Sequence, residues 1–93
     1  MKIEQSRIFE NKIKKLSKQE KGIVDTEIKR IIENPLIGEG KKGDLQGVSI
    51  HKFKIKTIQY LLSYRMIHKG LELIMIGSHE NYYRDLKSYL KRR

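Results

Sequence analysis

The sequence has no cysteine and only one proline among its 93 residues. Without cysteine, the chain can form neither a disulfide framework nor a zinc site with thiolate ligands, and this composition fits a reducing compartment. No apolar run approaches the roughly 20 residues that cross a bilayer, and the N-terminus lacks the apolar core of a signal peptide. We therefore expect a cytoplasmic protein with no membrane partner, no metal and no other cofactor.

Acidic residues are few relative to basic ones. Eleven Asp and Glu against 21 Lys and Arg give a net charge of +10 on a chain that is long enough for one small domain, residues 1–93. Such a charge favours polyanionic partners, which could be nucleic acid, an acidic protein segment or an anionic membrane surface. A merely solvated basic surface is the alternative. The charge and its placement favour contact with nucleic acid.

Two helices are predicted in the first third of the chain, after a weak strand signal at residues 2–5. They span 7–16 and the segment from Ser17 to Asn34, and in both the apolar residues recur at spacings of three and four. Pro35 ends the second helix, because proline disfavours a helical conformation in the residue before it. Almost no loop separates the two helices, so we expect them to pack antiparallel as a hairpin.

A glycine-rich basic loop at 36–47 leads into three predicted strands. These strands span 48–56, 58–68 and 71–76, and short turns join them into an antiparallel meander. A final helix is predicted over 81–90. Helices followed by a run of strands predict an α+β domain in which helices cover one face of an antiparallel sheet.

The stretch from 71 to 84 is the part around which we expect the molecule to be organised. Its first six residues are almost wholly apolar, which is typical of a strand covered on both faces. Gly77 permits a tight exit from this strand. Polar groups follow at once: Ser78, His79, Glu80, Asn81, Tyr82, Tyr83 and Arg84. They form either a site held rigidly at the end of a buried strand or a solvated connection to the last helix.

This order of elements resembles the RelE/ParE superfamily of bacterial type II toxins. The likeness spans nearly the whole chain, and short segments at fixed places in that order carry it: Asn34-Pro35, 42–47, 51–55, 59–65 and the apolar strand that leads to Gly77-Ser78-His79. The resemblance implies a RelE/ParE-like α+β fold, with an N-terminal helical hairpin packed on the antiparallel sheet and a short C-terminal helix. It also implies a cognate antitoxin, whose acidic or amphipathic segment would cover a basic groove.

The resemblance leaves two activities open. Members with a RelE-like basic site cleave mRNA in the ribosomal A site, whereas the ParE branch inhibits DNA gyrase and typically lacks the catalytic residues. The chain is therefore expected to be a ribosome-dependent mRNA interferase, which is an endoribonuclease. The alternative is a gyrase inhibitor without nuclease activity. A nucleic-acid-binding module of another function is a third possibility, since fold alone does not fix function.

Two histidines are candidates for the proton transfers of RNA cleavage. Without a metal, this reaction needs a base for the ribose 2′-hydroxyl, an acid for the leaving oxygen and cations for the charged transition state. His79 is the first candidate acid or base, because imidazole titrates near neutrality and the Gly-Ser-His sequence is similar to that of YafQ-type members. A surface histidine at a helix start is the alternative. His51 is the second candidate, although sharing a strand face with Phe53 favours a hydrogen-bonded core histidine.

Three cations complete the predicted catalytic set. Lys52 and Lys54 match the paired lysines of the RelE strand and share one strand face, so both could reach a phosphate or one could act as base. A solvated strand face is the alternative. Arg65 is expected to hold phosphate, although the strand arginine of RelE aligns with Leu61, two pleats away on the same face. We expect these cations to converge with His79 in one pocket.

The remaining candidates are predicted to bind RNA rather than to catalyse. Tyr83 could stack on a base and Arg84 could hold a phosphate, while Lys41 and Lys42 lie in the basic loop. The late tyrosine of RelE has no counterpart in this sequence.

Overall fold

The computed structural model describes residues 1–93, and its centre is a five-stranded sheet in the order β1-β5-β4-β3-β2. The strands are β1 (Lys2–Gln5), β2 (Glu39–Gly40), β3 (Ser49–Ile55), β4 (Ile58–Ile67) and β5 (Gly70–Gly77). The predicted meander of β3, β4 and β5 is confirmed, because both of its pairings are antiparallel. The sheet as a whole is mixed rather than antiparallel, since β1 pairs in parallel with β5.

Three α-helices pack around the sheet: α1 (Arg7–Lys14), α2 (Lys18–Glu33) and α3 (Tyr82–Lys91). The first two begin at serine caps. Ser6 Oγ accepts a hydrogen bond from the backbone of Phe9, and Ser17 forms a capping box with Glu20. The hydrogen bond from the Ser17 backbone holds the pKa of Glu20 below its usual value. None of the helices is long and apolar enough to span a bilayer.

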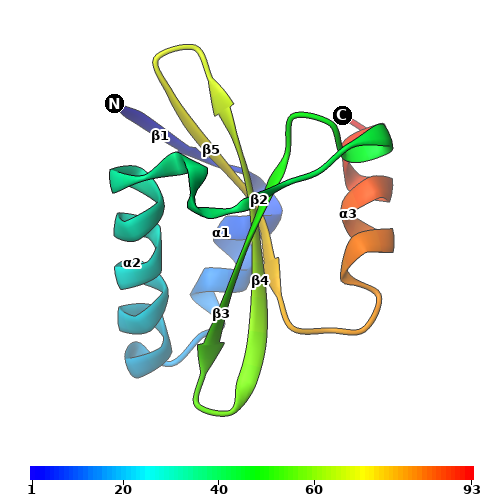
Figure 1. The fold of residues 1–93 in the computed structure, drawn as a ribbon. Coiled ribbons are helices and arrows are strands. Elements are labelled where there is room, and N and C mark those ends of the chain that lie inside the picture. Colours follow the sequence, from blue (N-terminus) through cyan, green and yellow to red (C-terminus); the bar gives the residue numbers. More distant parts are fainter.

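The helices cover both faces of the sheet, with α2 on one face and α3 on the other (Figure 1). The expectation that helices cover one face only is therefore wrong. Helix α1 lies beside the second half of β5, where β1 has ended. It contributes to both sides, because Phe9 belongs to the core under α2 and Ile8 packs against the core under α3.

Two apolar cores result from this arrangement. The core under α2 has ten buried residues: Phe9, Val24, Ile31, Phe53, Ile55, Leu62, Tyr64, Leu71, Leu73 and Ile76. The core under α3 has seven: Leu45, Val48, Ile50, Ile74, Met75, Tyr82 and Leu86. All residues of β5 are buried, which confirms the prediction of a strand covered on both faces.

A β-bulge in β5 adapts the strand to these two cores. Ser63 pairs with Met75 and Tyr64 with Leu73, so Ile74 has no partner on β4. Its carbonyl accepts a hydrogen bond of 2.5 Å from Ser6 Oγ. Ser6, the N-cap of α1, therefore also provides a hydrogen-bond donor for the carbonyl group of the extra residue in the bulge.

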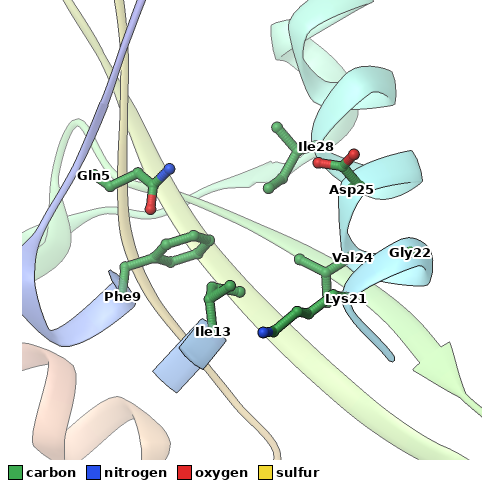
Figure 2. Close-up of a pocket in the computed structure, with 8 residues that line it drawn as sticks. All are labelled: Gln5, Phe9, Ile13, Lys21, Gly22, Val24, Asp25 and Ile28. Atoms are coloured by element: carbon green, nitrogen blue, oxygen red, sulfur yellow. The ribbon is translucent and has the colours of Figure 1, made fainter. Parts of the chain in front are cut away.

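A hollow of about 340 Å³ separates the facing surfaces of α1 and α2. Figure 2 shows Phe9 and Ile13 of α1 opposite Val24 and Ile28 of α2. The two helices follow one another directly, as expected, but α1 packs against β5 and α2 against β3. Contacts with different strands therefore position the two helices, more than contacts of the helices with each other.

Candidate nucleic-acid interface

A groove crosses the sheet face under α3, where β5 ends. We call it the basic groove; its volume is about 310 Å³, and it is lined by Lys52, Gln59, Leu61, Ser78 and Tyr83. The β3–β4 register pairs Lys52 with Leu61 and Lys54 with Gln59, so Lys54 stands directly beside the groove. Both lysines are exposed, and neither ammonium has a carboxylate oxygen within 4.0 Å. Neither charge is therefore held in an ion pair, although the Lys52 charge, after that of Lys41, helps to hold the pKa of Glu39 below its usual value.

The aromatic side of the groove is Tyr83, and the loop before β3 places a further cation near it. Lys41 Nζ lies 5.3 Å from the centroid of the Tyr83 ring, a cation–π arrangement. Lys41 also donates a hydrogen bond to Glu39, which lowers the pKa of Glu39 and raises the pKa of Lys41. Lys41 is thus charged but already interacts with Glu39 and Tyr83. Lys42 is exposed and forms no ion pair, and it does not line the groove.

Tyr82 fixes the helix that carries this aromatic side. Its hydroxyl lies 2.6 Å from the carbonyl oxygen of Met75 and 2.9 Å from Ser63 Oγ, deep under α3. Burial raises the pKa of the Tyr82 phenol far above its usual value, so the phenol stays neutral and keeps donating. The Tyr83 ring stands edge-on to Tyr82, with centroids 5.8 Å apart. The Tyr83 ring, which lines the groove, is therefore held in place by the buried and hydrogen-bonded Tyr82.

His79 does not line the basic groove. Its Nε2 lies 3.0 Å from Asp85 Oδ2, and its ring packs against Tyr82 with centroids 5.7 Å apart. The ring also lies close over Gly77, where a Cβ would come within 2.9 Å of His79 Nδ1. The side chain faces α1 rather than the lysines, so the expected convergence of His79 with Lys52 is not found.

His51 lies on the opposite face of the sheet, in the core under α2. It is only 6% exposed, its Nε2 is 2.7 Å from Glu27 Oε1, and it stacks on Phe53 with centroids 5.7 Å apart. Arg30 also contacts Glu27, at 3.3 Å. The structure thus places His51 as a hydrogen-bonded core histidine that links β3 to α2, away from the groove.

Arg65 faces the same side as the groove but at the other end of β4. Its Nε lies 2.8 Å from Glu72 Oε1, and the second oxygen of Glu72 accepts a hydrogen bond of 2.6 Å from Arg93. Four residues along a strand separate Arg65 from Leu61, or about 13 Å. Arg65 is therefore neutralised and remote from the groove. The sequence contained a signal for this pairing. A two-residue turn at 68–69 sets Ile67 opposite Gly70, and this register places Arg65 opposite Glu72.

The groove thus joins some of the predicted residues and leaves others out. It brings Lys52 together with Tyr83, while Lys54 and Lys41 lie next to it. Arg84 is exposed, lies 3.4 Å from Asp85 and does not line the groove. Three lining residues had no predicted catalytic or RNA-binding role: Gln59, Leu61 and Ser78. Gln59 and Leu61 line the groove because they pair with Lys54 and Lys52. The alternation of β4 in the sequence does not reveal which residues of β3 it pairs with, so it could not identify these two residues. No group of three or more His, Asp or Glu side chains is arranged to hold a metal ion.

Comparison with known proteins gives a match to a family model and matches to solved structures, two of which are described below. A family model described as the ParE-like toxin of type II bacterial toxin–antitoxin systems matches residues 3–87. A chain of the intact E. coli RelBE toxin–antitoxin complex superposes with a TM-score of 0.66 at 19% identity, over 84% of this chain and 95% of that chain. The isolated E. coli RelE toxin, in its P21 crystal form, gives 0.63 at 18% identity, over 94% and 96%. At identities below 20%, these matches show that this chain has the same fold as the two solved structures. No curated protein matches the sequence.

Proposed function

This chain belongs to the ParE-like toxins of type II bacterial toxin–antitoxin systems, and we propose that it is a ribosome-dependent mRNA interferase that binds RNA in the basic groove. The observation that carries the proposal is the groove itself. Lys52 and Lys54 stand without carboxylate partners beside the half-buried ring of Tyr83. Ammonium groups suit the phosphates of RNA, and an aromatic face suits an unstacked base. Cleavage on the ribosome would place the toxin in the cytoplasm.

The groove supports a metal-independent cleavage. In this reaction the ribose 2′-oxygen attacks the adjacent phosphorus and the bond from phosphorus to the 5′-oxygen breaks, which leaves a cyclic phosphate and a 5′-hydroxyl. Lys52 and Lys54 would stabilise the negative charge of the transition state. The proton carriers within the groove are the Lys52 amine and the Tyr83 phenol. His79 remains a predicted acid or base, and in that role its ring must leave Asp85 and turn toward the Ser78 side of the loop.

Primer extension of a reporter mRNA after induction of the toxin tests the proposal. We expect codon-phased cuts from the unmodified toxin and their loss in K52Q/K54Q. The matched control K14Q/K91Q removes two exposed lysines that lie outside the groove, and it should cut normally. Loss of cutting in H79A would assign His79 a catalytic role, whereas full activity of H79A would remove it from the mechanism. Absence of cuts from the unmodified toxin would contradict the proposal.

A DNA gyrase inhibitor is the second candidate function, and a specific observation favours it. No histidine lines the groove, and Arg65 is held by Glu72, so two expected parts of the cleavage machinery lie elsewhere. The matching family model also carries the name ParE-like. Supercoiling by purified gyrase in the presence of the toxin is the discriminating assay. Inhibition of supercoiling together with intact reporter mRNA would replace the interferase by the gyrase inhibitor.

We also propose a cognate antitoxin as partner. One structural neighbour is a toxin–antitoxin complex, and an acidic segment would complement the unpaired lysines of the groove. Coexpression with the adjacent small open reading frame should restore growth. Failure of every adjacent small gene to do so would count against this partner.

A further inference from the structure

A second hollow, of about 330 Å³, lies on the other side of α3, between α1 and α3. We call it the α1–α3 hollow. Its polar lining consists of Lys12, His79, Asp85, Tyr89 and Arg92. The buried end of β5 forms an apolar floor below these side chains. Residues of two helices and of the loop after β5 therefore meet in one depression that the basic groove does not include.

The charges of this hollow are unbalanced. Lys12 and Arg92 have no carboxylate oxygen within 4.0 Å. Asp85 is the only acid in the lining, and it already lies 3.0 Å from His79 Nε2 and 3.4 Å from Arg84 Nε. Two cations from different helices thus face the same depression without an internal partner. An anion bound between them would relieve their repulsion.

The hollow and the basic groove meet at the turn between β5 and α3. Ser78 lines the groove, whereas the next residue, His79, lines the hollow. On α3, Tyr83 faces the groove, whereas Asp85, Tyr89 and the C-cap residue Arg92 recur at helical spacing and line the hollow. A strand whose base stacks on Tyr83 would reach the hollow by crossing the turn at 78–81.

We propose that the α1–α3 hollow binds a backbone phosphate of the same single-stranded RNA, held between Lys12 and Arg92. This inference rests on the proposed function, since it takes RNA as the ligand of the groove. Continuity with the groove favours RNA over an acidic peptide, because phosphates recur along one chain and can occupy both depressions at once. In the position that His79 has in this structure, its contact with Asp85 keeps that carboxylate engaged and leaves the two cations to the phosphate.

Binding of a fluorescein-labelled single-stranded RNA oligonucleotide, followed by anisotropy over a salt series, tests the proposal. For K12Q/R92Q we expect roughly tenfold weaker binding at low salt, because two cationic contacts are lost. The slope of log affinity against log salt should become shallower by about 1.4, which corresponds to two phosphate contacts on a single strand. The control K14Q/K91Q removes the same charge from the same two helices outside the hollow and should keep the original slope.

The outcomes separate this inference from the proposed function. If K52Q/K54Q weakens RNA binding and K12Q/R92Q behaves like its control, the hollow proposal is overturned and the groove stands. If neither pair alters RNA binding, both fail. If K12Q/R92Q binds RNA normally but loses affinity for the antitoxin, the hollow holds an acidic peptide and the phosphate assignment is wrong. Circular dichroism and thermal unfolding confirm that each variant is folded.

Discussion

The two ends of the sheet face under α3 both carry cations, but only one end leaves them free. Near the end of β5, Lys52 stands opposite Leu61, which offers no charge. At the other end, Arg65 stands opposite Glu72, which binds it at 2.8 Å. The cross-strand neighbour therefore decides whether a cation is available to a ligand or is used within the fold. The net charge of +10 does not reveal this division.

The occupied end acts as a structural clamp. Glu72 is 8% exposed and accepts hydrogen bonds from both Arg65 and Arg93, so one carboxylate joins β4, β5 and the segment after α3. The free end has the opposite character, with exposed lysines that form no ion pair. This difference separates stability from function at the two ends of β4, and the following substitutions test it.

Glu72→Gln should have the largest effect, because it removes the carboxylate that distinguishes the two ends. We expect a loss of about 2 kcal/mol in the free energy of unfolding. The loss stays below the 3–5 kcal/mol typical of a fully buried pair, since both arginines are partly exposed. Urea unfolding measures the change, with Glu10→Gln as an exposed control. Equal stability of the two variants would show that Glu72 is no clamp.

Tyr82, between the two ends, should make the protein sensitive to alkali. Its pKa is raised in the folded state by burial, whereas the unfolded phenol ionises near pH 10. Above that pH the unfolded chain loses the proton and the folded chain retains it, so stability falls as pH rises. We expect a loss approaching about 1.4 kcal/mol per pH unit from this group. Urea unfolding at pH 8 to 11.5 should show a shallower loss in Y82F; equal slopes would contradict this assignment.

Comparing Lys52→Gln with Arg65→Gln tests the division directly. Lys52→Gln should weaken RNA binding about tenfold and change stability by no more than about 0.5 kcal/mol. Arg65→Gln should leave RNA affinity unchanged and lower stability by about 1 kcal/mol, because Glu72 loses one of its donors. RNA anisotropy and urea unfolding give both values. An equal loss of RNA affinity in the two variants would mean that the arginine end also meets the ligand.

Gly77→Ala should have the smallest effect on stability, below about 1 kcal/mol. The added methyl group would lie 2.9 Å from His79 Nδ1, so the ring must move and its contact with Asp85 weakens. NMR chemical shifts of the imidazole report this displacement. A spectrum identical to that of the unmodified protein would show that Gly77 does not set the position of His79.

Residue periodicity and helix caps predicted much of the fold. The sequence did not reveal the pairing of β1 or the direction in which the side chains of the loop after β5 point. The serine caps and the alternation of β3 are local signals, so the start of α2 and the shared face of Lys52 and Lys54 were predictable. The parallel pairing of β1 depends on a contact across about 70 residues. The expected convergence of His79 with the lysines was not found, and the sequence could not show this because a side chain in a turn has no period to follow.

The position of α1 beside β5 has a consequence for association between molecules. The stretch of β5 that β1 does not pair would otherwise present open backbone groups to another chain. Helix α1 lies beside that stretch, and Ser6 donates to the carbonyls of Leu73 and Ile74, where the pairing with β1 ends. The strands left at the margins are β1, with four residues, and β2, with two. Edge-to-edge growth is therefore disfavoured along β5. On the far side β2 pairs only with Ser49 and Ile50, and the exposed Lys52 and Lys54 oppose pairing of another chain with the rest of β3.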